Sequence, residues 1–102
     1  MVQRRRRKIE WTVNAVLTKK SVFYYWNNRN KSIVYSRKLN QLFTTTLLMV
    51  ESSPEASLAI KKENIRAILV KDYYLIVEIT ELNIKVLDIW DTRQNSQNFP
   101  IK

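Results

Sequence analysis

Residues 65–90 read IRAILVKDYYLIVEITELNIKVLDIW, which is three short apolar runs separated by two polar breaks. Each run has the length of a strand and is rich in β-branched and aromatic residues. The runs are Ile65 to Val70, Tyr73 to Ile79 and Ile84 to Trp90. The breaks at 71–72 and 80–83 are short enough to make neighbouring strands antiparallel. Because the chain contains no Gly, we expect Asp72 and Asn83 to occupy the positive-φ positions of these turns.

The pattern upstream changes from a period of two to a helical period. Lys8 to Thr12 alternates between apolar and polar residues, which predicts a short first strand. A first helix follows, and the apolar residues expected on one of its faces are Val13, Val16, Leu17 and Tyr24. The run Asn27-Asn28-Arg29-Asn30 interrupts this helix, because Asn readily adopts left-handed turn conformations. We therefore expect a joint between two helices at 27–30.

The second helix has the clearest periodicity in the sequence. Its apolar stripe consists of Tyr35, Leu39, Leu42, Phe43, Thr46, Met49 and Val50. Asn30 or Ser32 can cap its N-terminus, and Ser52-Ser53-Pro54 ends it, because the residue before a proline avoids helical geometry.

The order of these elements is β-α-α-β-β-β. It predicts an α+β fold with a twisted, mainly antiparallel sheet and an N-terminal helical hairpin packed on one face. We expect a single domain over residues 1–102, in which residues 1–7 form a flexible basic arm.

Composition narrows the possible functions. The chain of 102 residues is 45% hydrophobic, which is enough for one compact core. It contains neither Cys nor His, so thiol chemistry is excluded and a metal would depend on carboxylates alone. We interpret Glu78, Asp88 and Asp91 as solvent-facing residues of the sheet rather than a metal site, and we expect no cofactor. The sequence contains no recognisable signal peptide or membrane-spanning stretch, which predicts a cytoplasmic protein.

The net charge of +9 is concentrated in the first half of the chain. Up to Val50 the charges sum to +10, and from Glu51 onward they sum to −1. Such a field attracts nucleic acids or acidic protein segments without selecting among them. The residues that we expect to contact a polyanion or a partner are Arg4, Arg5, Arg6, Arg7, Arg29 and Arg37. For the run at 4–7 we favour a solvated tail with non-specific affinity.

Several segments of the sequence resemble landmarks of one branch of the RelE/ParE superfamily of bacterial toxins. They are Tyr24-Tyr25-Trp26-Asn27-Asn28-Arg29-Asn30-Lys31-Ser32, Ser53-Pro54-Glu55, Asn64-Ile65-Arg66, Asp72-Tyr73-Tyr74 and Trp90-Asp91-Thr92-Arg93-Gln94-Asn95. The resemblance implies the same β-α-α-β-β-β fold and a role as the toxin of a type II toxin–antitoxin system that arrests bacterial growth. It also implies a partner, a small antitoxin whose disordered tail wraps the toxin. The basic half of the chain would be complementary to an acidic tail.

Two mechanisms occur in this superfamily. RelE-like members cut messenger RNA on the ribosome, whereas ParE-like members poison DNA gyrase and have no known catalytic residues of their own. RelE-like sites carry lysines on the strand that matches 65–70, an arginine after the next turn, another beyond the last strand, and a tyrosine or histidine near the C-terminus. In this chain Arg66 is the single cation on that strand, Tyr74 stands where the first arginine would be, Arg93 matches the second, and Phe99 replaces the titratable ring.

The incomplete set favours the ParE-like mechanism and no enzymatic activity. Phe cannot transfer a proton, and tyrosine, with an ordinary pKa near ~10, is a poor base. The alternative is a RelE-like mRNA endoribonuclease in which Arg66, Arg93 and Tyr74 are catalytic. A further alternative is a basic binding module without toxicity.

Aromatic residues and Arg93 each have a structural and a functional interpretation. We expect Tyr24, Tyr25 and Trp26 to fill the seam between the hairpin and the sheet rather than to stack on nucleobases, and Trp90 to lie in the core. Arg93 is the residue that we expect to matter most for function. Its structural alternative is an ion pair with Asp91 that only pins the C-terminal turn.

Overall fold

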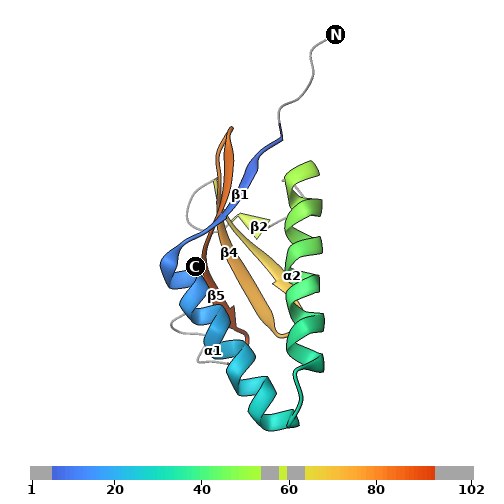
Figure 1. Cartoon of the computed structure of the whole chain (residues 1–102). Helices are drawn as coiled ribbons and strands as arrows, with labels where there is room; N and C mark the ends of the chain where they lie inside the picture. Colours follow the sequence, from blue (N-terminus) through green and yellow to red (C-terminus); the bar gives the residue numbers. More distant parts are fainter. Residues whose placement is uncertain (1–5, 54–57, 60–63, 94–102) are drawn as a thin grey trace.

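The computed structural model describes residues 6–53, 58–59 and 64–93, which form a sheet covered on one face by two helices (Figure 1). The elements are β1 (Lys8–Trp11), α1 (Val13–Asn30), α2 (Val34–Ser52), β2 (Leu58–Ala59), β3 (Ile65–Val70), β4 (Tyr73–Ile79) and β5 (Asn83–Asp91). The predicted α+β order is confirmed, and β2 is an additional short strand that the sequence pattern did not reveal. Among the described residues, no helix is long and apolar enough to cross a lipid bilayer.

The five strands form one mixed sheet in the order β1-β5-β4-β3-β2. β1 pairs with β5 in parallel, and all other neighbours are antiparallel. Since residues directly opposite each other point to the same face, the register shows which side chains meet the helices. Tyr73, Leu75 and Val77 of β4 lie on the helix-covered face and belong to the core.

A bulge in β5 determines which side chains near the C-terminus face the helices. Ile76 pairs with Asp88 and Val77 pairs with Val86, so Leu87 has no residue opposite it. The extra residue reverses the alternation of faces along the strand. Val86 and Ile89 therefore both reach the core although three positions separate them. The bulge also turns Asp91, which pairs with Tyr73, toward the helices.

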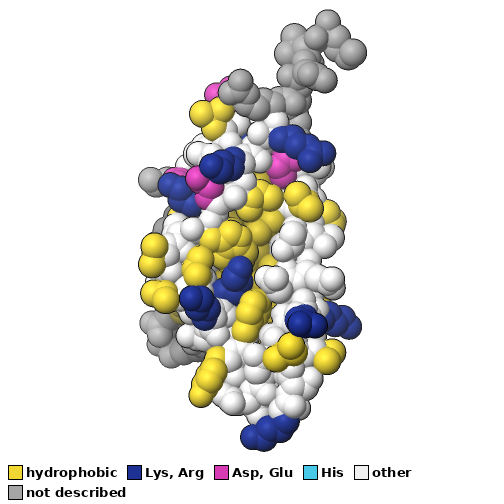
Figure 2. All heavy atoms as spheres, in the orientation of Figure 1, with side chains coloured by type: hydrophobic (Ala, Val, Ile, Leu, Met, Phe, Trp, Pro, Cys, Tyr) yellow, Lys and Arg dark blue, Asp and Glu magenta, His cyan; other side chains and the backbone are white. Residues whose placement is uncertain are grey.

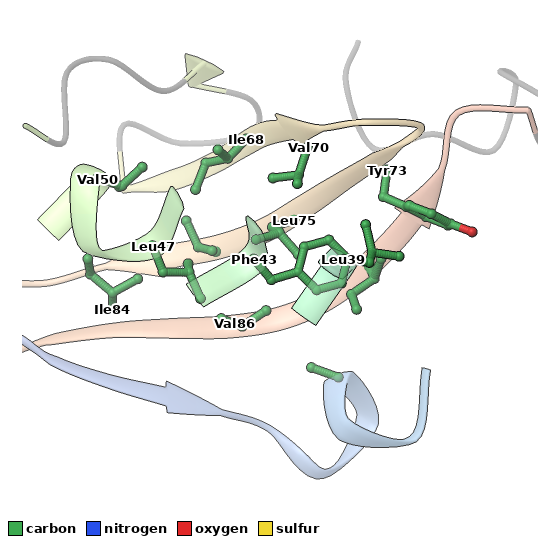
Figure 3. Close-up of a cluster of buried hydrophobic side chains, with 13 residues drawn as sticks. Leu39, Phe43, Leu47, Val50, Ile68, Val70, Tyr73, Leu75, Ile84 and Val86 are labelled. Carbon is green, nitrogen blue, oxygen red and sulfur yellow. The ribbon is translucent and has the colours of Figure 1, made fainter. Parts of the chain in front are cut away.

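The core lies between α2 and the sheet, where Leu39, Phe43, Leu47 and Val50 meet side chains of β3, β4 and β5 (Figure 3). The predicted stripe is confirmed at Leu39, Phe43 and Val50, but it is wrong at Met49, whose surface is 66% exposed. Leu47 takes that place with 1% exposure. The two residues lie about 200° apart around the helix, so only one of them can face the sheet.

The predicted inward face of α1 is wrong at three of its four residues, and the fourth, Val16, is half-buried. Val13, Leu17 and Tyr24 are 78%, 57% and 71% exposed, whereas Ala15 is fully buried. Trp26, eleven residues after Ala15 and thus on the same side of the helix, packs against the core. Ala15 is small, which allows the helix to lie close to β5, whereas Val13, Leu17 and Tyr24 remain on the outside.

A side-chain cap and a left-handed residue set the bounds of α1. The Thr12 hydroxyl accepts a hydrogen bond from the Ala15 amide at 3.0 Å and begins α1 directly after β1. α1 continues through Asn30, and Lys31, with φ 53°, adopts the left-handed conformation that we expected within 27–30. The Ser32 amide donates to the Asn27 carbonyl, which is the bond of a Schellman motif.

The capping prediction for α2 is wrong, because its N-cap residue is Ile33 and no side chain makes the cap hydrogen bond. Ser32 lies one residue earlier. Its hydroxyl accepts a hydrogen bond from the Val34 amide, whereas Asn30 still belongs to α1. α2 ends at Ser52, as predicted, and Pro54 lies outside the described residues.

The predicted positive-φ positions in the β-turns are wrong. Lys71, rather than Asp72, has a positive φ, of 55°. Two-residue hairpin turns of the common types require positive φ at their first residue, and Lys71 holds that position. Asn83 is instead the first residue of β5, and hydrogen bonds with Thr80 close its turn without a positive φ.

Arg7 is anchored, so the prediction of a flexible arm is wrong at this residue. Its amide donates to the Glu51 carboxylate at 3.1 Å, and its Nε donates to the Thr80 carbonyl at 2.8 Å. Arg7 thus joins the end of α2 to the β4–β5 turn. Glu51 is only 4% exposed, and burying its carboxylate requires partners of this kind.

Candidate functional site

Arg93 follows β5 directly and is held by Asp91, the last residue of that strand. The Arg93 amide and Nε both donate to Oδ1 of Asp91 at 2.9 Å, and Nη2 donates to Oδ2 at 2.8 Å. The side chains form a bidentate pair, the strongest geometry for an arginine and a carboxylate. Because the backbone amide also takes part, the guanidinium is fixed relative to the end of the sheet.

Two aromatic residues of α1 lie beside the guanidinium. Its Cζ atom is 5.8 Å from the ring centre of Tyr25 and 5.5 Å from that of Trp26. Trp26 is oriented in turn by a hydrogen bond from its Nε1 to the hydroxyl of Tyr73 at 2.7 Å. Arg93, Asp91, Trp26 and Tyr73 therefore form one connected group between α1 and the ends of β4 and β5, which we call the Arg93 cluster.

The electrostatics of the Arg93 cluster favour its paired state. Hydrogen bonds from Arg93 lower the pKa of Asp91 below its ordinary value, although partial burial acts in the opposite direction. Burial of the phenol raises the pKa of Tyr73 above its usual value, so this hydroxyl remains protonated at neutral pH. At that pH the cluster holds one carboxylate, one guanidinium and one neutral phenol, and it has no group suited to exchange protons.

A cleft opens next to the Arg93 cluster. It has a volume of about 570 Å³, and its lining residues are Thr18, Ser21, Val22, Tyr25, Tyr73, Ile89, Asp91 and Arg93. Val22 and Ile89 supply apolar lining, the charged groups lie at the end of the sheet, and α1 adds the hydroxyls of Thr18 and Ser21. The arrangement suits binding of a segment with mixed polarity more than acid–base chemistry.

The structure does not bring Arg66, Tyr74 and Arg93 together. Arg66 pairs with the core residue Val77, which lies on the helix-covered face. Val77 is four residues along β4 from Tyr73, or about 13 Å at the usual rise of a strand. Arg93 is on the same face but at the Tyr73 end of the sheet.

Tyr74 lies on the opposite face from Arg66 and Arg93. It pairs with Leu69 on one side and with Trp90 on the other, and Leu69 is 58% exposed. The sheet therefore separates its phenol from the guanidinium of Arg93.

The predicted contact arginines have different surroundings. Arg6, Arg29 and Arg37 are exposed, and the guanidinium of Arg29 lies 5.9 Å from the ring centre of Trp26. Arg7 is engaged within the molecule. Arg4, Arg5 and Phe99 lie outside the described residues.

The aromatic predictions had mixed outcomes. Packing of Trp26 against the core is confirmed. The prediction is wrong for Tyr24 and Tyr25, which are 71% and 45% exposed, and for Trp90, which is only partly buried on the far face of the sheet. Sequence reasoning missed Tyr73 as a partner in the site, although its place at the start of a strand, next to a tight turn, pointed to the sheet end where Arg93 lies.

No family model matches the sequence, and no curated protein matches it. A solved structure described as "Chromosomal ParDE TA system from P. aeruginosa" contains a chain that is similar in fold, with a TM-score of 0.68 and 10% sequence identity. The similarity covers 85% of this chain and 97% of that chain. At this identity it shows a shared fold. The architecture that the sequence resemblance implied is thus the architecture observed.

Proposed function

We propose that this chain is the toxin of a toxin–antitoxin system and that it arrests growth by binding DNA gyrase rather than by cutting RNA. The single observation that carries this proposal is the separation of Arg66, Arg93 and Tyr74 on a sheet with the fold of a ParDE chain. The fold supports the assignment to a toxin–antitoxin system, and the separation of the three residues supports a mechanism without RNA cleavage.

Cleavage of RNA by attack of the 2′-hydroxyl requires cations around the scissile phosphate and a group that moves protons. In this chain the Arg93 guanidinium is paired with Asp91, and Tyr74 is on the far face. Burial raises the pKa of Tyr73, the tyrosine near Arg93, so a smaller fraction of this phenol is ionised and able to accept a proton at neutral pH. These features favour a surface that binds its target over one that catalyses.

Exposed apolar side chains on the helices support the presence of an antitoxin. Val13, Leu17 and Tyr24 project from α1, and Val34 and Met49 project from α2, each with more than half of its surface exposed. Figure 2 shows further hydrophobic side chains in the hollow between the two helices, with Lys and Arg side chains around it. An apolar surface of this extent with a basic surround suits an amphipathic acidic segment.

The direct test uses purified gyrase. We expect the full chain to inhibit supercoiling of relaxed plasmid DNA. We expect the candidate antitoxin, the product of the neighbouring reading frame next to the gene for this chain, to relieve that inhibition. The Arg93→Gln variant tests the site, and Lys38→Gln removes one exposed charge elsewhere on the molecule as a matched control. Unimpaired supercoiling at a large excess of the chain would contradict the proposed target.

A further inference from the structure

The cleft beside the Arg93 cluster contains two hydrogen-bond donors that no described residue uses. Nε and Nη2 of Arg93 donate to Asp91, but no described residue accepts from its Nη1. The Tyr73 oxygen accepts from Trp26, and its own hydrogen has no acceptor among the described residues. Tyr73 is 2% exposed and lines the cleft, so this donor is available only to a group that enters the cleft.

Both donors are pre-organised. Asp91 holds the guanidinium through two side-chain bonds, and Trp26 orients the Tyr73 ring through a bond of 2.7 Å. A ligand that binds them does not have to order these side chains, so less conformational entropy is lost on binding. Both donors suit an oxygen acceptor, and the guanidinium makes its stronger hydrogen bond with a charged one.

The rest of the lining combines apolar side chains with the hydroxyl side chains of Thr18 and Ser21. Val22 and Ile89 form its wall, and the ring of Tyr25, 45% exposed, forms part of its rim. A ligand that fills the cleft therefore carries an apolar side chain next to its anionic group. A nucleic-acid backbone fits less well, because it requires several cations along its path, and Arg93 is the only cation among the described residues that line the cleft.

We propose that this cleft binds a carboxylate flanked by an apolar side chain on the tail of the antitoxin, with Arg93 and Tyr73 donating to the carboxylate. The identity of the occupant rests on the function proposed above. The chemistry of the bound group rests on the geometry of the cleft. The net charge of +9 attracts an acidic tail, and the cleft determines where one of its carboxylates is held.

The chemistry of the cleft can be tested by NMR with the full chain and two short peptides. The probes are acetyl-Leu-Glu-Leu-amide and its neutral counterpart acetyl-Leu-Gln-Leu-amide. We expect the Glu peptide to shift the amide signals of Ser21 and Val22 and the Nε–H signal of Arg93. It should bind about fivefold more tightly than the Gln peptide, since a charged acceptor makes the stronger hydrogen bond. In Arg93→Gln this preference should vanish, and in Lys38→Gln it should persist.

Three results of this titration would overturn the proposal. They are equal binding of the two peptides, shifts that lie away from the cleft, and tighter binding of a uridine hexanucleotide at the same signals. The third would assign the cleft to nucleic acid.

The occupant is tested with the product of the neighbouring reading frame. Arg93→Gln should raise the dissociation constant of that complex about tenfold, as expected when one charge-assisted contact is lost. Ser21→Trp, an exposed position at which the larger ring blocks the cleft, should do the same, whereas Lys38→Gln should change the constant less than twofold. If the blocking variant binds as well as the original chain, the tail does not use the cleft. Failure of the proposed function is a separate result, namely unchanged growth on expression of the chain.

Discussion

Several contacts hold the partly exposed side chain of Arg93 in place. Its side chain is 46% exposed, yet three hydrogen bonds to Asp91 and two neighbouring rings fix the guanidinium. An ion pair between long side chains at the surface usually adds little to the free energy of unfolding, because ordering the two side chains costs conformational entropy. Here the backbone amide of Arg93 also donates to Asp91, so the backbone provides part of the ordering. The Asp91–Arg93 ion pair, which the sequence suggested as a purely structural feature, also positions the guanidinium.

Replacing Arg93 by Gln should affect function much more than folding. The ion pair is partly exposed, so its loss should cost about 0–1 kcal/mol of unfolding free energy. Urea denaturation measures this change, and a growth assay after induction measures toxicity. We expect near-normal stability with reduced growth arrest, and Lys38→Gln should change neither. A destabilisation of several kcal/mol would mean that Arg93 serves the fold.

Stability in acid should report the pairing of Asp91. Because its folded-state pKa is lowered, Asp91 contributes stability above its unfolded pKa of about 3.9, and this contribution is lost as the pH falls through the folded pKa. The difference in unfolding free energy between the original chain and Arg93→Gln should therefore be largest above pH 5 and shrink below pH 4. A difference that stays constant across this range would exclude the pair as its cause.

Tyr73→Phe should destabilise the protein by about 1–3 kcal/mol, because the Nε1–H group of Trp26 then loses its acceptor in a partly buried position. Thermal or urea denaturation gives the value. Tyr24→Phe is the matched control, since that phenol is on a residue 71% exposed and should be removed with little effect. Equal effects of the two changes would show that the Trp26–Tyr73 bond contributes nothing to stability.

The sequence predicted single residues of the site better than their partners. The closeness of Asp91 and Arg93 in sequence suggested an ion pair as the structural alternative to a functional role, and that pair is present. Tyr73 and Trp26 are 47 residues apart, and their bond depends on how α1 crosses the end of the sheet. No local pattern contains that crossing, so the assembled cluster was not predictable.

At the scale of elements, periodicity predicted α2 and failed for α1. In α2 one continuous stripe faces one sheet, so the pattern and the burial nearly coincide, with Met49 as the exception. In α1 the apolar residues are spread around the helix, and Val13 and Leu17 face outward. When apolar residues lie on more than one face of a helix, its periodicity does not show which face is buried.

The bulge in β5 was also not predicted, although its signal is in the sequence. Ile84, Val86 and Ile89 are all buried, and the spacing of three between the last two breaks the period of a regular strand. A spacing of three between apolar residues does not by itself indicate a bulge, because it also occurs in regular strands that carry apolar residues on both faces. The hydrogen bonds from Thr12 and Asn14 to the Leu87 carbonyl show what the bulge provides, which is a contact between the start of α1 and the sheet.

Phe43→Ala in α2 should cost about 3–5 kcal/mol of unfolding free energy, because Phe43 is fully buried and contacts Trp11, Phe23 and Tyr73. Met49→Ala on the same helix should cost less than about 1 kcal/mol, since Met49 is 66% exposed. Urea denaturation of both variants tests which face of α2 is inside. A reversed order of the two costs would contradict the packing shown in Figure 3.

At the scale of the whole molecule, both helices lie on one face of the sheet, and the residues that could make a nuclease are divided between the two faces (Figure 1). The Arg93 cluster faces α1, whereas Tyr74 and Leu69 face away from the helices. The same α+β fold can therefore serve a mechanism based on binding, in which side chains need to match a partner but not to converge on one bond.

Primer extension on cellular transcripts after induction of the chain tests this account most directly. We predict growth arrest with intact messenger RNA, and the same transcript ends in cells that express the original chain and Arg93→Gln. Cuts at regular positions within codons that appear with the original chain and disappear with Arg93→Gln would contradict the account, because they would require a nuclease site that includes Arg93.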